Sequence, residues 1–466
     1  MASLSSRNNF KLPVCLLSLA VASLLAVGCG SGSSGTTATG PTGSSFVVGT
    51  DAPMSNVTSF AVVIDSVDAI DASGKSVSLV SGTPTVDFAR FNGLQTLMDM
   101  NDVPAGTYTS VQITLGSATL GYLTTATGSA PTITTEPATL TTSTVNVTLA
   151  TPLVVTQTGA PVGLRLDFDL FKSILTSGGQ ITGSVTPTFN VSTVANSDTG
   201  AYLDEFDAAV VSVNTTAQSF VVQGPHGRQF TVNVTGNTEW ENSESLSALT
   251  SSSIVQVSGT LNKADATIDA DDVAILSQSG FFADGQVTYV TPASGTATNF
   301  NLYVRGLLPT TTSLSLGQIA TVNVNANENF FIYRAHNTLT QFLFNSGNML
   351  AGQAVAIGGP TSGISGTTVT PTRVALRGWG FNGTVGSASN INAAAGTFQM
   401  TISGFAGALI PQTVTVYTSS VTTYRNGLTA FSSVASGASV RVVGLLIKDP
   451  TTGGTDLLAR YVDTLN

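Results

Sequence analysis

Two acidic residues separated by one position could carry chemistry. Asp167 and Asp169 lie in the run Leu166-Asp-Phe-Asp-Leu170, and residues two apart on a strand project from the same face. Glycoside hydrolysis needs two carboxyl groups about 5 to 10 Å apart across the sugar. Neighbours on one strand repel each other and do not flank a cleft. A structural or ion-binding role is therefore favoured over a catalytic one.

A denser acidic set lies further along the chain. Residues 204–276 contain ten acids against two bases. Oxygen ligands at this density suit calcium, but the spacing of an EF-hand loop is absent, so a solvated acidic face is favoured. We therefore predict no cofactor, with calcium as the weaker alternative. Its candidate ligands are Asp167, Asp169, Asp269, Asp271 and Asp272.

Other catalytic arrangements have few residues to work with. The chain has two histidines, His226 and His336, whereas a zinc site draws three or four ligands from histidine, cysteine and carboxylates. A Ser–His–Asp triad has few candidate bases, and no Gly-x-Ser-x-Gly turn is present. The glycines from Gly378 to Gly383 have dinucleotide-binding spacing but precede a strand pattern instead of the required helix. We predict that the protein is not an enzyme.

Cys29 ends a segment with the features of a lipoprotein signal. Arg7 and Lys11 precede an apolar run over residues 12–27. This run is shorter than the roughly 20 residues that span a bilayer. The phrase Leu24-Leu-Ala-Val-Gly-Cys29 resembles the lipobox of bacterial lipoproteins, with alanine where leucine is more usual. The resemblance implies a signal peptide over 1–28 and a diacylglyceryl group on the Cys29 thiol.

The residues after Cys29 extend this interpretation. Positions 29–45 are mostly glycine, serine and threonine, a composition typical of a flexible tether. Gly30 stands where aspartate would be expected for inner-membrane retention in many Gram-negative bacteria. The resemblance therefore implies lipid anchoring in the cell envelope, at the outer membrane, facing the periplasm or the cell surface. An acyl-glycerol anchor carries more than one fatty chain, which suffices for stable attachment.

Charge limits the possible partners. Removal of the signal peptide would leave 14 basic against 26 acidic residues, a formal charge of −12, in a chain of which 9% is charged. Nucleic-acid phosphates attract clustered lysine and arginine, and no such cluster is present. We predict no nucleic-acid partner. Cys15 would leave with the signal peptide, so Cys29 would have no cysteine for an internal disulfide.

The rest of the chain predicts an all-β fold. Short runs of Val, Thr, Ile and Phe alternate with polar residues and are broken by Gly, Asn, Pro and Ser. The first unit, residues 46–194, resembles a bacterial lipoprotein domain of unknown function, which implies a β-sandwich and gives no catalytic residue. The phrases that carry this resemblance are Asp51-Ala-Pro53, Pro104-Ala-Gly-Thr-Tyr-Thr109, Arg165-Leu-Asp-Phe-Asp-Leu170 with Ser173-Ile174, and Val185-Thr-Pro187.

A threefold repeat follows this unit. Thr231-Val-Asn-Val234, Thr321-Val-Asn-Val324 and Thr413-Val-Thr-Val416 recur 90 and 92 residues apart. Each repeat has five strand patterns with a short helical segment between the third and fourth, which is the order of an OB-type barrel. The repeats also resemble a second bacterial domain of unknown function. We predict three tandem, OB-like, five-stranded barrels that each close their own core, over 203–276, 281–376 and 378–466.

Aromatic residues recur at one place in these repeats. Trp240, Tyr333 and Tyr424 each follow the third strand pattern. In small barrels such residues fill the core or stack against sugars and bases. Recurrence in all three repeats favours the core, because every small barrel must fill its interior. The three remain candidates for ligand stacking.

These observations favour contact over catalysis. We predict a lipid-anchored envelope protein that acts as a non-enzymatic binding or scaffolding module, with an envelope protein or a glycan as partner. The alternative is a carbohydrate-binding or adhesion lipoprotein that uses the barrel faces and possible calcium. A glycoside hydrolase built on the Asp167 and Asp169 carboxylates is less favoured.

Overall fold

The computed structural model describes most of the 466-residue chain. The described residues are 41–52, 57–91, 94–124, 132–158, 161–177, 180–194, 202–224, 227–262, 267–293, 295–309, 313–333, 342–403, 413–449 and 452–465. The chain divides into two units, Met1–Thr37 and Ala38–Asn466. The predicted signal peptide and Cys29 lie outside the described residues. Within those residues, no helix is both long and apolar enough to cross a membrane.

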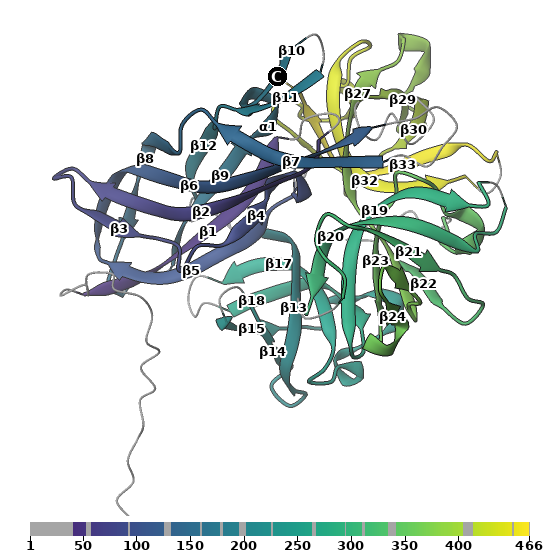
Figure 1. The fold of residues 1–466 in the computed structure, drawn as a ribbon, viewed down its shortest axis with the longest axis horizontal. Coiled ribbons are helices and arrows are strands. Elements are labelled where there is room, and N and C mark those ends of the chain that lie inside the picture. The colour runs from purple at the N-terminus through teal and green to yellow at the C-terminus, as the bar shows by residue number, and fades with distance from the viewer. Residues whose placement is uncertain are drawn as a thin grey trace, which may run out of the picture. The chain divides into compact units, whose positions relative to one another are not determined.

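The prediction of an all-β chain is confirmed (Figure 1). Residues 42–194 form two sheets. The first has the strand order β12-β9-β1-β5, with bounds Phe189–Val194, Val162–Asp169, Thr42–Ala52 and Thr96–Pro104. The second has the order β10-β11-β7-β6-β2-β3, with bounds Ile174–Ser177, Gln180–Val185, Thr132–Leu140, Gly106–Thr124, Val57–Asp71 and Ser76–Ser78.

Two further strands and two short helices complete this region. Strand β4 (Thr85–Asp87) pairs with β2, and β8 (Thr144–Val155) pairs with β6. The 3-10 helix η1 (Phe88–Arg90) and helix α1 (Leu170–Ser173) connect strands. One buried cluster joins both sheets, and Phe168 packs in it against Phe60 and Phe88, with ring centroids 4.9 and 5.1 Å apart.

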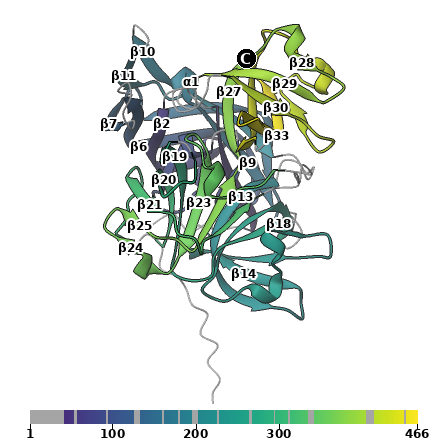
Figure 2. The same cartoon turned by 90° about the vertical axis from the view of Figure 1, so that its right-hand side faces the viewer.

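Three more sheets follow in chain order (Figures 1 and 2). The third sheet has the order β15-β14-β13-β17-β18-β16, and β15 also pairs with β18. Its strands in that order are Gln229–Asn233, Ser219–Gln223, Tyr202–Asn214, Ile254–Asn262, Thr267–Ser277 and Glu239–Trp240.

The fourth sheet has the order β22-β26-β23-β19-β20-β21-β25-β24. Its strands are Asn329–Ile332, Arg373–Arg377, Ala354–Gly359, Phe281–Thr291, Asn299–Leu308, Ile319–Asn323, Thr368–Val369 and Ile364–Ser365.

The fifth sheet has the order β27-β32-β33-β30-β29-β28, with β31 on β33 and an additional pairing of β27 with β29. Its strands are Trp379–Val385, Ser439–Lys448, Thr455–Thr464, Thr413–Tyr417, Thr397–Ile402, Ile391–Asn392 and Thr423–Arg425.

Short 3-10 helices lie in two of the three segments predicted to be helical, 246–249 and 431–435, and directly before the third, 349–352. They are η5 (Leu246–Ala248), η6 (Ser346–Asn348) and η9 (Phe431–Ser433). Further 3-10 turns are η4 (Glu241–Ser243), η7 (Thr361–Gly363) and η8 (Ala388–Asn390).

The expectation that each repeat closes its own core is wrong for the third and fourth sheets, whose buried clusters include residues of other sheets, whereas the fifth sheet also has a buried cluster made of its own residues. Phe46 and Val48 on β1 belong to the same buried cluster as Phe206 on β13. Val47, between them, points into the cluster of the first two sheets. Strand β1 is therefore buried on both faces, which its uninterrupted apolar run requires. The fourth and fifth sheets also share a buried cluster, to which the fifth contributes Leu445, Ile447 and Leu458.

Candidate functional site: a buried ionic junction

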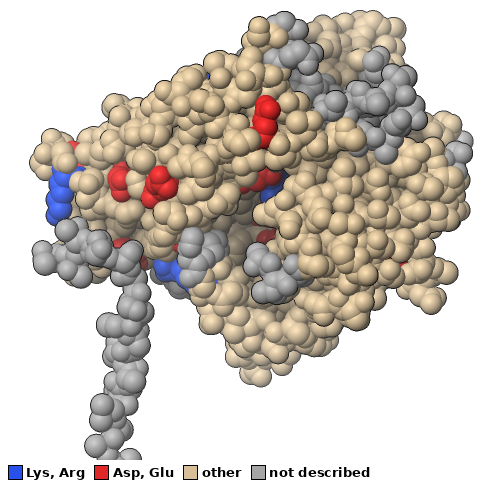
Figure 3. Space-filling view, viewed as in Figure 1, with Lys and Arg blue, Asp and Glu red and all other residues tan. Residues whose placement is uncertain are grey.

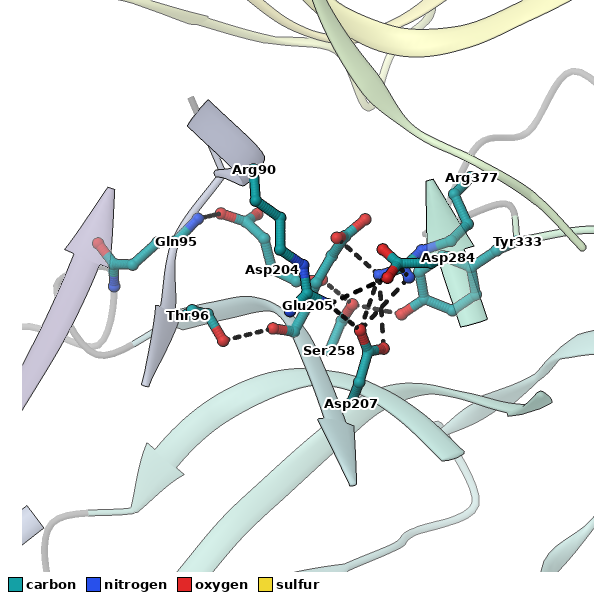
Figure 4. Close-up of polar contacts among 10 residues, drawn as sticks. All are labelled: Arg90, Gln95, Thr96, Asp204, Glu205, Asp207, Ser258, Asp284, Tyr333 and Arg377. Carbon is teal, nitrogen blue, oxygen red and sulfur yellow. Dashed lines mark hydrogen bonds and ion pairs between the residues drawn. The ribbon is translucent and has the colours of Figure 1, made fainter. Parts of the chain in front are cut away.

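A cluster of five charged residues joins segments far apart in the sequence. Its members are Arg90 on η1, Glu205 and Asp207 on β13, Asp284 on β19 and Arg377 on β26 (Figure 4). We call this cluster the ionic junction. Much of the visible surface carries neither acidic nor basic side chains (Figure 3), so the concentration of charge at a buried place sets this cluster apart.

Strand β13 presents the acids of the junction because its pairing is irregular. Between Leu203 and Phe206 its register with β17 shifts, so two residues stand opposite Ser258. Such a bulge redirects side chains. Glu205 lies in the bulge and Asp207 follows it, and both carboxylates reach Arg377, while Asp204 is buried and has other partners.

Arg377 is the centre of the junction. Its side chain is 2% exposed, and its guanidinium lies 2.7 Å from Glu205, 2.9 Å from Asp284 and 3.3 Å from Asp207. Arg90 adds a second guanidinium, 2.7 Å from Asp207 and 3.5 Å from Asp284. A planar guanidinium with five N–H donors suits several carboxylates at once, which a lysine does not.

The junction holds three carboxylates against two guanidinium groups. Desolvation raises the pKa of Glu205 to about 7, although Arg377 acts in the opposite direction. Desolvation also raises the pKa of Asp207. Burial opposes the charge on Arg377, but the surrounding carboxylates outweigh that effect and raise its pKa. The excess of one negative charge favours one bound proton near neutral pH.

Asp204 connects the junction to the first and fifth sheets. One carboxylate oxygen accepts the Gln95 backbone N–H at 2.9 Å. The other accepts the Tyr461 hydroxyl at 2.7 Å and lies 3.3 Å from the Arg460 guanidinium. Thr96 adds a bond from its hydroxyl to the Glu205 carbonyl at 2.7 Å. A buried carboxylate that accepts several hydrogen bonds is held in one position. Asp204 therefore has a structural role instead of a role in proton transfer.

The predicted acid pair is divided between two surroundings. Asp169 caps α1 by accepting the Lys172 backbone N–H at 3.0 Å, and it forms an ion pair with Lys172 Nζ at 2.9 Å. Asp167 accepts a bond from Asn190 at 3.3 Å, and desolvation raises its pKa. Asp169 therefore caps a helix and Asp167 accepts a bond from an amide, so the two carboxylates have separate structural partners.

The aspartates of β18 also differ from one another. Asp269 is exposed and accepts bonds from the Asn233 and Asn262 amides, both at 2.9 Å. Asp271 is half-buried, and Asp272 is fully buried opposite Ser258 on β17. In the part of the chain that the structure describes, no group of three His, Cys, Asp or Glu residues is placed to hold a metal ion.

The three candidate stacking residues occupy different places. Trp240 packs on the core of the third sheet, 6.5 Å from the Phe220 ring, and Tyr424 packs on the core of the fifth sheet. Tyr333 is 2% exposed and belongs to a cluster that also contains Leu276 and Phe282. Its hydroxyl is hydrogen-bonded to the Ser258 hydroxyl (Figure 4). Tyr333 thus joins the third and fourth sheets.

A polar cavity lies at one side of the fourth sheet. Its volume is about 720 Å³, and it is lined by the turn 325–328 after β21 and by residues of 360–372 around β24 and β25. Glu328 is its acidic residue. Desolvation raises the pKa of Glu328 to about 7.

Neither the ionic junction nor this cavity was predicted from the sequence. The ion pairs of the junction join residues that are 93 to 194 positions apart in the sequence, so no local spacing reveals it. One signal was present. In a chain with 9% charged residues, Arg305 and Arg377 stand within apolar strand patterns, where an arginine needs a buried partner.

Comparison with known families gives two matches. Residues 46–223 match the family described as "Domain of unknown function (DUF4382)", and residues 208–274 match the one described as "Domain of unknown function (DUF5666)". No curated protein matches the chain. The chain therefore contains two domains of unknown function, as the sequence resemblance implied. The first match runs through β13, the strand that carries two acids of the junction, to the end of β14.

Proposed function

We propose that this protein is a lipid-anchored bacterial envelope protein that acts as a non-enzymatic binding or scaffolding module. The observation that carries the proposal is that the buried charged side chains pair with one another across the sheets. Arg377 engages carboxylates from β13 and β19, and Arg90 adds η1. Charged groups held in this way fix the sheets against one another, which is what a rigid display surface needs.

The finer architecture is part of this proposal. A β-sandwich over 46–194 is followed by three OB-like barrels over 203–276, 281–376 and 378–466. The shared core of the first two sheets supports the sandwich. In the third sheet β15 pairs with both β14 and β18, and in the fifth β29 pairs with both β30 and β27. These pairings support a barrel in the first and third repeats, whereas the described strands of the fourth sheet make no additional pairing of this kind.

Lipid anchoring is tested at Cys29. In a bacterial host, Cys29→Ser is expected to release the protein from the membrane fraction, because one thiol would carry the anchor. The native chain is expected to incorporate radiolabelled palmitate and the variant is not. Membrane retention of the variant would contradict the anchor. Hydrolysis of an envelope glycan that Asp169→Asn abolishes would contradict the non-enzymatic role.

A second candidate function is carbohydrate binding, which the polar cavity of the fourth sheet favours. Hydroxyl and amide side chains line that cavity together with Glu328. Such groups form the directional hydrogen bonds that sugars need. A screen of the purified full chain against an oligosaccharide array tests this candidate, and the absence of any bound glycan would exclude it.

A further inference from the structure

The walls of the polar cavity are built by backbone hydrogen bonds. The Thr370 N–H donates to the Gly363 carbonyl at 2.8 Å, and the Gly363 N–H donates to the Pro360 carbonyl at 2.9 Å. A Cβ atom at position 363 would lie 2.5 Å from the Thr370 carbonyl oxygen. Because glycine permits this close approach, the segments around η7 and β25 form one continuous wall.

Hydroxyl and amide side chains make up much of the cavity lining. The cavity's volume of about 720 Å³ falls within the roughly 300–1,000 Å³ of small-molecule sites. Hydroxyl groups are the commonest functional group in the lining, and two asparagine amides accompany them. The hydroxyl-bearing residues are Ser362, Ser365, Thr368, Thr370 and Thr372. Hydroxyl groups donate and accept hydrogen bonds, so they suit a ligand that does the same.

Glu328 supplies the acidic group of the cavity. Its Oε1 accepts the Asn325 backbone N–H at 2.9 Å. Its Oε2 is buried and has no hydrogen-bond partner among the residues that the structure describes. A buried polar atom of this kind is destabilising until a donor is supplied. Because Oε2 is closed to solvent, a donor on a bound ligand satisfies it once the Glu328 carboxylate rotates toward the cavity.

We infer that this cavity binds a neutral, hydroxyl-rich ligand, a short saccharide, with the Glu328 carboxylate accepting a hydrogen bond from one of its hydroxyl groups. The inference rests on the second candidate function and names its site. Lysine, arginine and histidine are absent from the described lining residues, so an anionic ligand would meet a carboxylate without a compensating cation. An apolar ligand would leave the hydroxyl and amide groups without partners.

The test measures saccharide binding by the full chain in detergent. An array of neutral glucose, galactose and mannose oligosaccharides, with sialylated and sulfated counterparts, identifies bound glycans, and calorimetry gives their dissociation constants. Glu328→Ala is expected to weaken binding about tenfold or more, because it removes a hydrogen bond to a charged group. Ala326→Trp, an exposed position on the cavity turn, is expected to block the site without altering Glu328.

A matched control separates the cavity from the rest of the chain. Glu136→Ala changes a half-buried carboxylate on β7, in the second sheet, and is expected to leave binding unchanged. Neutral glycans that bind the native chain and the control but not the two cavity variants would support the inference. Neutral glycans that bind all four proteins equally would overturn the site and leave carbohydrate binding standing. Binding of acidic glycans alone, or of no glycan, would also overturn it.

Discussion

Glu205 in the ionic junction and Glu328 in the polar cavity have similar pKa values and different surroundings. Burial raises the pKa of each to about 7. Glu205 lies 2.7 Å from the Arg377 guanidinium. Glu328 has backbone and hydroxyl neighbours, and its Oε2 has no hydrogen-bond partner among the described residues. A raised pKa therefore does not distinguish the carboxylate that holds the sheets from the one that we propose to bind a ligand, whereas the charge of the neighbouring side chains does.

The largest expected effect follows from removing the centre of the junction. Arg377→Ala leaves Glu205, Asp207 and Asp284 with one fewer guanidinium in a desolvated place. Breaking a buried ion pair in this way costs roughly 3–5 kcal/mol. Urea denaturation of the native chain and the variant measures the change in the free energy of unfolding. A change below about 1 kcal/mol, the range of exposed ion pairs, would show that the junction does not hold the sheets.

The next effect is a dependence of stability on pH. An acid whose folded pKa is raised holds a proton that the unfolded chain releases, so stability decreases as pH rises between the unfolded and folded pKa values. For Glu205 this window runs from 4.5 to about 7. We expect the free energy of unfolding to fall by about 1–3 kcal/mol from pH 5 to pH 8.

Single variants apportion that pH dependence. Glu205→Gln balances two carboxylates with two guanidinium groups and is expected to reduce the slope, while Glu328→Gln removes the contribution of the cavity. A slope that Glu205→Gln leaves intact would contradict the excess negative charge assigned to the junction.

A smaller effect is expected at Tyr333. Tyr333→Phe removes the hydroxyl bonded to Ser258 between the third and fourth sheets, and it leaves a buried serine hydroxyl with one fewer partner. The expected cost is about 1–2 kcal/mol. Tyr424→Phe is the matched control, because Tyr424 packs on the fifth sheet's core while remaining partly exposed. Equal effects of the two variants would remove the special role of Tyr333.

The smallest effect is expected at an ion pair whose cation faces solvent. Lys172 lies 2.9 Å from Asp169, and the Lys172 side chain is 61% exposed, although the Asp169 side chain is 7% exposed. Water screens the exposed ammonium group, and Asp169 keeps its hydrogen bond from the Lys172 backbone N–H, so the pair contributes little. We expect Lys172→Ala to leave the urea midpoint within error of the native value. A shift as large as that of Arg377→Ala would contradict the contrast between buried and exposed charge.

Local patterns in the sequence predicted the strands but not how they share cores. The alternation in Thr231-Val-Asn-Val234 and its repeats predicted strands, which the structure confirms as β15, β21 and β30. The apolar run Phe46-Val-Val48 also predicted a strand. Its burial on both faces could not be predicted, because the second face packs on residues more than 150 positions later in the chain.

The candidate site was harder to predict for a related reason. Asp167 and Asp169 attracted a chemical interpretation because they are adjacent on a strand, yet one caps a helix and the other accepts an amide. Arg377 and its partners were missed because their contact depends on how the third and fourth sheets and the helix η1 pack together. Periodicity reports which face a residue occupies, but it does not report which distant residue lies opposite.

The central claim is that shared cores and the ionic junction make the sheets unfold together. The chain's two tryptophans allow a direct test, since Trp240 reports on the third sheet and Trp379 on the fifth. Urea unfolding is followed by fluorescence in Trp240→Phe and in Trp379→Phe, alongside circular dichroism of the native chain. We predict one transition, with the same midpoint from all three probes. Separate midpoints for the two tryptophans would contradict the claim.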